Sequence, residues 1–180
     1  MPVPGDGRVT VLGMDDITAL ILDDHHAFRV GFARLDDAKT NEELRALWQP
    51  LALHLEVHAD AEELILYPHL LVDVASDEAV EETEDAIRDH NKIRDGIHEA
   101  NRHPVGSDQW WAGVWKTRTE NSDHLREEED EVLPDFRKHA TSQLRRELAV
   151  RWLTFYGEHP QGKGLSFEDK DPQKYIEENR

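Results

Sequence analysis

Apolar residues recur at intervals of three and four positions along four long segments of the chain. This spacing places them on one face of a helix, and it predicts four amphipathic helices whose apolar faces are buried. No segment shows the apolar–polar alternation that is typical of a half-buried strand. Each segment is preceded by residues that commonly cap a helix N-terminus: Asp15 or Asp16, Thr40 or Asn41, Ser76 or Asp77, and Ser107 or Asp108.

The connections between these segments are short, and short connections make consecutive helices antiparallel neighbours. The sequence therefore predicts an all-α fold: an up-down-up-down antiparallel four-helix bundle with a short additional C-terminal helix and tail. Pro50 is expected to kink the second helix, whereas Pro68 and Pro134 are expected to end or bend the second and fourth helices. The predicted units are an N-terminal tail (1–14), the bundle (15–140), an additional helix (141–156) and a polar C-terminal tail (157–180). Leu165, Phe167 and Tyr175 of this tail could pack back on the bundle.

Histidine and glutamate interrupt the apolar faces of the second and fourth helices in the same way. The string HADAEELILYP begins at His58 and puts Glu62 one turn later. The string HLREEEDEVLP begins at His124 and puts Glu128 one turn later. A four-residue interval places both side chains of each pair on one helix face, and that face is the apolar one. The two helices are therefore expected to present matching His–Glu pairs to the interior.

The first and third helices each place one histidine on the apolar face, His25 in DDHHAF and His90 in RDHNKI. Ionised glutamates buried without partners are very costly, so the glutamates of the other two helices need compensation. A hydrogen-bonded network with protonated histidines is one solution, and metal ions are the other. Imidazole and carboxylate suit iron, manganese or zinc, and two carboxylates can bridge a pair of cations. Two matching pairs with two further histidines favour the metal site.

Six residues are therefore the expected metal ligands, with the two glutamates as bridges: His25, His58, Glu62, His90, His124 and Glu128. Tyr67 and His54 are candidates for a catalytic role as proton donors near the metal. His54 lies one turn before His58, which leaves the roles of ligand, outer partner and bystander open. Glu63 and Glu129 are expected to face solvent or to hydrogen-bond a ligand histidine. Asp24 is expected to be a surface charge, with an outer role as the alternative.

Composition excludes several other classes of function. The net charge of −18 disfavours binding to nucleic acids and to anionic membranes, since both require an excess of Lys and Arg. The absence of cysteine excludes disulfides, thiolate metal sites and cysteine nucleophiles. The N-terminus lacks a basic segment followed by an apolar run, and no apolar run has the length of a membrane span. A cytoplasmic protein is the resulting expectation.

The strings LILDDHHAF, HADAEELILYP, IRDHNKI and HLREEEDEVLP resemble the ligand motifs of the hemerythrin-like, or HHE cation-binding, family. The resemblance implies a four-helix bundle with two Fe ions in an oxo- or hydroxo-bridged centre that meets O2, peroxide or NO. Manganese and zinc are the expected substitutes. Animal oxygen carriers of this family have a second histidine where this chain has Arg94, and they end with His-x-x-x-x-Asp rather than His-x-x-x-Glu. The resemblance is closer to the bacterial members.

Three classes of function remain open from the sequence. The first is an enzyme that consumes peroxide or oxidises a substrate at a diiron site. The second is a protein that senses O2, NO or redox state, or stores iron, without turnover. The third is a metal-free acidic interaction module. The first two need the same metal ligands, and they differ in access to the site and in the groups that surround it.

Overall fold

The computed structural model describes residues 16–180, and every regular element within them is helical. The prediction of an all-α fold is therefore confirmed. The longest helices are α1 (Ile17–Asp37), α2 (Asn41–Ala61), α4 (Asp77–Asn101) and α5 (Asp108–Glu127). The tail expected at 1–14 lies outside the described residues. None of the helices in residues 16–180 has the length and apolar character that a membrane crossing requires.

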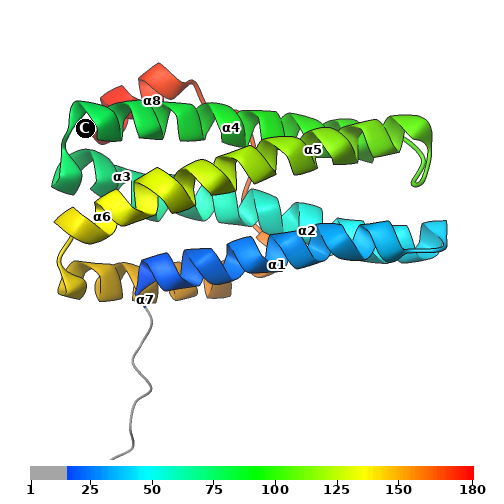
Figure 1. Ribbon diagram of the computed structural model, residues 1–180, viewed down its shortest axis with the longest axis horizontal. Helices are drawn as coiled ribbons and strands as arrows, with labels where there is room; N and C mark the ends of the chain where they lie inside the picture. Colours follow the sequence, from blue (N-terminus) through cyan, green and yellow to red (C-terminus); the bar gives the residue numbers. More distant parts are fainter. Residues whose placement is uncertain (1–15) are drawn as a thin grey trace, which may run out of the picture.

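The long helices lie lengthwise beside one another. Figure 1 shows α2 returning alongside α1, and α5 returning alongside α4. The apolar faces predicted from the sequence are turned inward: Ile21 and Phe28 of α1 and Ile87 and Ile97 of α4 are fully buried. The hydrophobic periodicity therefore identified the packed faces correctly.

Side-chain caps fix where the helices begin. Asp16 accepts hydrogen bonds from backbone amides in the first turn of α1. The Thr40 hydroxyl accepts a hydrogen bond from the backbone amide of Glu43, and the Glu43 carboxylate accepts one from the backbone amide of Thr40. These two bonds form a capping box at the start of α2. Ser76 and Ser107 cap α4 and α5 in the same manner. Each cap satisfies amide groups that have no partner within the helix, so four of the predicted N-terminal boundaries are found in place.

Pro68 and Pro134, which end the two His–Glu strings, do not end their helices. After α2 the chain stays helical through η1 (Glu62–Leu66), α3 (Tyr67–His69) and η2 (Leu70–Val74), past Pro68. After α5 it stays helical through η3 (Glu128–Val132) and α6 (Leu133–His139), past Pro134. Both prolines sit in the first turn of a new α-helical segment, where a missing amide costs little. A wide turn before each proline makes this continuation possible.

Those wide turns are π-helical and begin at Glu62 and Glu128. The amide of Tyr67 bonds to the carbonyl of Glu62, and the amide of Leu133 bonds to the carbonyl of Glu128, each five residues back. A proline ring clashes with the carbonyl four residues before it, and a π-helical turn relieves that clash by inserting one residue. The same device therefore occurs at the two glutamates that the sequence pairs with histidine.

The apolar interior is divided into two clusters. One cluster contains Ile17, Ile21, Leu66 and Phe136 among its members, and the other contains Phe28, Phe32, Trp48 and Trp110. On α1, His25 lies between Ile21 of the first cluster and Phe28 of the second. The buried polar residues therefore form a layer between two apolar cores, which shield the layer from water at both ends.

The C-terminal part of the chain covers the bundle. Helix α7 (Ser142–Glu158) packs against α1, and after the short η4 (Pro160–Gly162) the chain crosses to α8 (Pro172–Asn179), which lies on α4 (Figure 1). The segment 157–180, which its composition suggested to be a polar tail, thus contains a helix. Tyr175 and Ile176 of α8 are buried. The packing of Tyr175 agrees with the alternative left open from the sequence, whereas the helix around it was not predicted.

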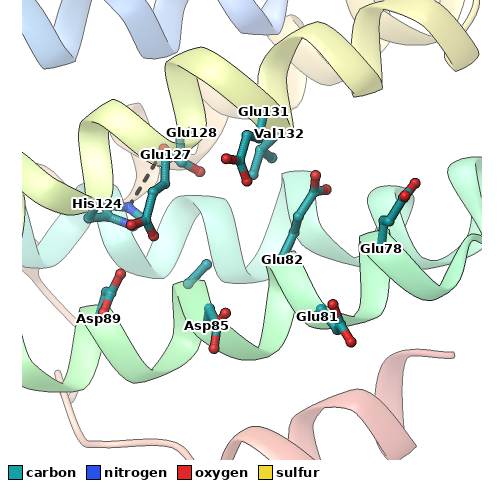
Figure 2. Close-up of a pocket in the computed structure, with 11 residues that line it drawn as sticks. Glu78, Glu81, Glu82, Asp85, Asp89, His124, Glu127, Glu128, Glu131 and Val132 are labelled. Carbon is teal, nitrogen blue, oxygen red and sulfur yellow. Dashed lines mark ion pairs between the residues drawn. The ribbon is translucent and has the colours of Figure 1, made fainter.

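A pocket opens beside the polar layer, between α4 and the α5–η3 segment. Figure 2 shows carboxylates from both sides around it. The acidic lining residues are Glu78, Glu81, Glu82, Asp85, Asp89, Glu127 and Glu131. His124 and Glu128 also line this pocket, although both are almost completely buried. The pocket therefore connects the acidic surface to the buried polar layer.

Helices α4 and α5 approach closely at a glycine, and this contact generates a prediction. A Cβ atom added at Gly113 would lie 2.4 Å from the backbone nitrogen of Ala100. Gly113→Ala is expected to lower the free energy of unfolding by about 1–3 kcal/mol, because two backbones must separate. Gly157→Ala is the control, since a Cβ there meets no atom within 4 Å. Urea denaturation measures both, and equal stabilities of the two variants would contradict the close packing.

Candidate metal centre

The structure brings the six predicted ligand residues into two groups that share Glu62. The first group is His25, His58, Glu62 and Glu128, and the second is Glu62, His90 and His124. In each group, one candidate ligand atom from every residue lies within 4.8 Å of the others. All six side chains are buried. They come from α1, α2, α4, α5 and the first residues of the two π-helical turns, η1 and η3.

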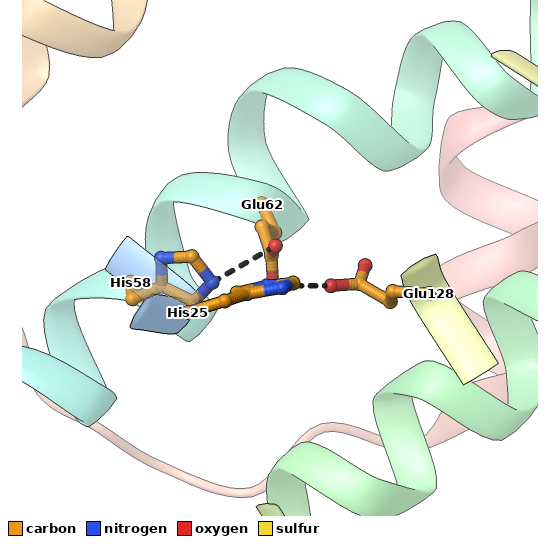
Figure 3. Close-up of side chains that lie close together, drawn as sticks. All are labelled: His25, His58, Glu62 and Glu128. Atoms are coloured by element: carbon orange, nitrogen blue, oxygen red, sulfur yellow. Dashed lines mark ion pairs between the residues drawn. The ribbon is translucent and has the colours of Figure 1, made fainter. Parts of the chain in front are cut away.

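The first group contains polar atoms that face one another without forming hydrogen bonds. Nε2 of His58 is 3.0 Å from Oε1 of Glu62, and Nε2 of His25 is 3.3 Å from Oε2 of Glu128 (Figure 3). All four atoms are buried and none has a hydrogen-bond partner. Unpartnered buried polar atoms are rare, because each loses its bonds to water. Their convergence on one point suits a bound cation.

The second group continues from the other oxygen of Glu62. Oε2 of Glu62 is 3.2 Å from Nε2 of His90 and 3.8 Å from Nε2 of His124. These two imidazole nitrogens are 3.1 Å apart. The two oxygens of Glu62 therefore face different groups, which is the arrangement that a bridging carboxylate requires. Oε2 of Glu128 is 3.6 Å from Nε2 of His124, so it too lies between the groups.

The buried carboxylates of this layer need positive charge to balance them. Burial by itself lowers the pKa of His58, but the carboxylates of Glu62 and Asp24 raise it to about 10. Burial raises the pKa of Glu62, but His58 and the other imidazoles hold it well below its usual range. The carboxylate of Glu62 is therefore ionised, and protons on imidazoles or metal cations must balance it. The donor set fits cations that accept nitrogen and oxygen ligands.

Three of the four imidazoles carry a carboxylate on the nitrogen that faces away from the centre. The pairs are His25 with Glu129 at 2.9 Å, His58 with Asp24 at 3.0 Å, and His90 with Glu63 at 2.8 Å. An ionised carboxylate accepts a hydrogen bond from Nδ1–H, which leaves Nε2 free to bind a cation. Glu63 and Glu129 thus adopt the hydrogen-bonding alternative of the sequence analysis. Asp24, expected at the surface, has the outer role instead.

His54 and Tyr67 lie in different places relative to the two groups. His54 joins neither group, because its Nε2 lies 3.0 Å from Oδ1 of Asp24. Tyr67 is fully buried, and its hydroxyl donates to Oε1 of Glu128 at 2.9 Å and lies 3.3 Å from Oε2 of Glu62. Burial and the nearby carboxylates raise the pKa of Tyr67 well above its usual value. Its O–H group therefore remains a proton donor beside both glutamates.

A buried arginine supports the second group from behind. Arg94 donates to Asp60 at 2.9 Å and to Glu63 at 3.0 Å, and Lys170 pairs with the same two carboxylates. Burial raises the pKa of Glu63, but His90 and Arg94 lower it to about 2, so its carboxylate is ionised. The sequence analysis assigned no role to Asp60 or Lys170. Asp60 lies in the string HADAEELILYP but at none of its ligand positions, and Lys170 reaches the site from a segment expected to be a tail.

The comparisons with known proteins point to one family. The family described as the hemerythrin HHE cation binding domain matches residues 16–147, which is most of the chain. The matched region contains all six residues of the two groups. Searches of curated proteins and of solved structures gave no match to this chain.

The buried ion pairs of Arg94 generate a stability prediction. Arg94→Met leaves Lys170 alone to balance the carboxylates of Asp60 and Glu63, so the free energy of unfolding should fall by about 3–5 kcal/mol. The control is Arg102→Met at the C-cap of the same helix, where the partner Glu99 is at the surface; its loss should stay within about 1 kcal/mol. Urea denaturation in the presence of a chelator measures both. Similar losses would show that the buried pairs contribute no more than a surface pair.

The acidic pocket generates a prediction about pH. Burial, and then the charges of Asp135, Glu131 and Glu78, raise the pKa of Glu82 from 4.5 to about 7. As pH rises from the pKa of 4.5 in the unfolded chain to about 7 in the folded chain, the unfolded chain releases the proton first. Ionisation of Glu82 therefore destabilises the fold, and this destabilisation is complete above pH 7. Because Glu82 is only partly buried, solvent screening limits this effect to about 1 kcal/mol.

Glu82→Gln should therefore be more stable than the natural chain at pH 8 by about 1 kcal/mol, with the difference shrinking toward pH 5. Chelator-treated protein and urea denaturation give the comparison. Glu81→Gln is the control, since Glu81 lines the same pocket and is exposed. A stability difference for Glu82→Gln that does not change with pH would contradict this account of the pocket.

Proposed function

Because the chain belongs to the hemerythrin HHE cation-binding family, we propose that its buried polar layer holds two iron ions and binds or reacts with O2, peroxide or NO. The proposed terminal ligands are His25, His58, His90 and His124, and the proposed bridges are Glu62 and Glu128. The four long helical segments act in this proposal as an up-down-up-down four-helix bundle that supplies these ligands from its interior. Manganese and zinc are the expected substitutes, since they accept the same donor atoms.

One observation carries the proposal. Nε2 of His25 and His58, Oε1 of Glu62 and Oε2 of Glu128 are buried, unpartnered and directed at one another. A structural network of histidine and glutamate would bring these atoms into hydrogen-bond geometry, because unpaired buried polar groups are costly. A cation at their centre satisfies all four at once. The second oxygen of Glu62, 3.2 Å from Nε2 of His90, would serve the second position.

Bound iron supplies the electrons with which small oxygen or nitrogen species are held or reduced. The chain itself contributes a proton donor, because the O–H of Tyr67 lies against both glutamates. It also excludes water on the side of the first group. Phe28 and Trp152 pack edge-on against the ring of His58, with ring centroids 5.0 and 5.4 Å apart.

The acidic pocket supports small neutral species as the molecules that reach the site. Its lining carries many carboxylates and leads to His124 and Glu128 (Figure 2). Negative potential in a narrow pocket repels anions and attracts cations. O2, hydrogen peroxide and NO are uncharged, so they can pass, and ferrous ions are attracted. Anionic substrates are disfavoured by the same field.

The proposal predicts the metal content of the protein. After aerobic purification without chelators, about two iron ions per chain are expected. His58→Ala and Glu62→Ala should each lose most of the iron, because each removes a central ligand. His26→Ala is the matched control, since His26 is the adjacent, exposed histidine on α1, and it should keep both ions. Elemental analysis with an absorption spectrum measures the content, and an iron-free natural chain would refute the proposal.

The same preparations test the reaction. Mixing the iron-loaded protein with O2, peroxide or NO should change its absorption spectrum, and the two ligand variants should show no change. Release of O2 from peroxide would favour an enzyme, whereas a spectrum that reverses when the gas is removed would favour a binding protein or sensor. A spectrum that is unaffected by all three molecules would leave metal binding intact and overturn the reactivity.

A further inference from the structure

The chain that follows residue 147 lies outside the family match, yet its side chains make polar contacts behind the candidate metal centre from two separate segments. Both contacts are made to carboxylates that hold the outer nitrogen of a candidate ligand histidine. One contact comes from α7 and the other from the segment that leads into α8. The two contacts involve different histidines, which belong to different groups of the centre.

The first contact is made by Tyr156 of α7. Its hydroxyl donates to Oδ2 of Asp24 at 2.8 Å, and the same oxygen lies 3.0 Å from Nδ1 of His58. The other oxygen of Asp24 is occupied by His54 at 3.0 Å. Asp24 is therefore held from three sides. Tyr156 fixes the oxygen that sets the orientation of the His58 ring, which belongs to the first group.

The second contact is made by Lys170. Its ammonium group pairs with Glu63 and lies 3.1 Å from Asp60. Two bonds with Asn91 of α4, of 2.8 and 3.0 Å, fix the backbone of Lys170 in this place. The hydroxyl of Tyr175 also donates to the backbone carbonyl of Glu63. Glu63 in turn holds Nδ1 of His90, which belongs to the second group.

The third outer pair shows that such support can also come from within the bundle. Glu129, which holds Nδ1 of His25, receives a bond of 2.8 Å from Arg29 of α1. The C-terminal segment thus supplies the comparable support for one histidine of each group. Histidines that bind metals depend on such outer partners for ring orientation and basicity.

We propose that the chain beyond residue 147 positions the two cation sites separately, with Tyr156 acting on His58 through Asp24 and Lys170 acting on His90 through Glu63. This inference rests on the proposed function. Tyr156 and Lys170 are positioning residues, because each acts through another side chain. Loss of either contact loosens one histidine and leaves the other in place, so each contact controls the affinity of one cation position.

The test uses the full-length chain loaded with zinc, which gives sharp NMR signals and needs no turnover. Tyr156→Phe should shift the Nδ1 proton resonance of His58 and leave that of His90 unchanged, and Lys170→Met should do the reverse. Each variant should lower the zinc affinity of one of the two binding steps by about threefold to tenfold, less than the loss for an outer partner itself. Competition with a chelator measures these affinities.

Controls separate positioning from charge and from loss of the fold. Lys174→Met removes the same charge from α8, but Lys174 pairs with Glu178 at the surface; it should change neither resonance. Lys170→Arg keeps a charged donor and should restore the affinity. Tyr156→Phe removes one oxygen atom, so circular dichroism should match that of the natural chain. A gain in zinc affinity in Lys170→Met would mean that Lys170 acts only as a repelling charge, and would overturn its positioning role.

The outcomes also separate this inference from the proposed function. A natural chain that binds fewer than two zinc ions overturns the proposed function, and this inference with it. A natural chain that binds two ions, with both variants unchanged in resonance and affinity, overturns this inference alone. Equal effects of each variant on both histidines would show a general role in stability and would also overturn it.

Discussion

The structure depends on the burial of two glutamates among four histidines. Glu62 and Glu128 are nearly inaccessible to water, and such carboxylates persist only where positive charge balances them. This requirement explains why the apolar interior is divided into two clusters with a polar layer between them. It also explains the outer carboxylates, which turn the imidazole rings so that one nitrogen of each faces the centre. The layer costs stability in a bundle of this size, and the apolar packing on both sides offsets that cost.

The helices and the central residues could be predicted from the sequence because both rest on local spacing. Helical periodicity defines the buried faces, the caps mark their starts, and a four-residue interval places His58 with Glu62. The contacts that the C-terminal segment makes with the outer carboxylates could not be predicted. Asp24 meets Tyr156, and Glu63 meets Lys170, across more than a hundred positions of chain. Such pairs leave no local pattern, and an acidic residue beside a histidine is most often at the surface. Packing of Tyr175 against the bundle was an open possibility from the sequence, but the helix α8 itself was not predicted, because its local apolar pattern is short.

The repeated string in the second and fourth helices has a structural explanation. In both copies the glutamate begins a π-helical turn and a proline follows it. The extra residue in the turn lets the helix continue past the proline, and it sets Glu62 and Glu128 at the junction between the ordinary and the widened helix. The proline in each string therefore accompanies the π-helical turn that places the glutamate in the interior.

The two groups of the centre differ in how completely the protein surrounds them. Four side chains converge on the first group, beside α7, whereas three converge on the second, beside α4 and α5. The acidic pocket is lined by His124 of the second group and by Glu128 of the first. The aromatic rings of Phe28 and Trp152 pack against His58 of the first group. A nearly symmetric pair of sequence strings therefore builds an asymmetric centre, with an acidic pocket at His124 and Glu128 and aromatic rings at His58.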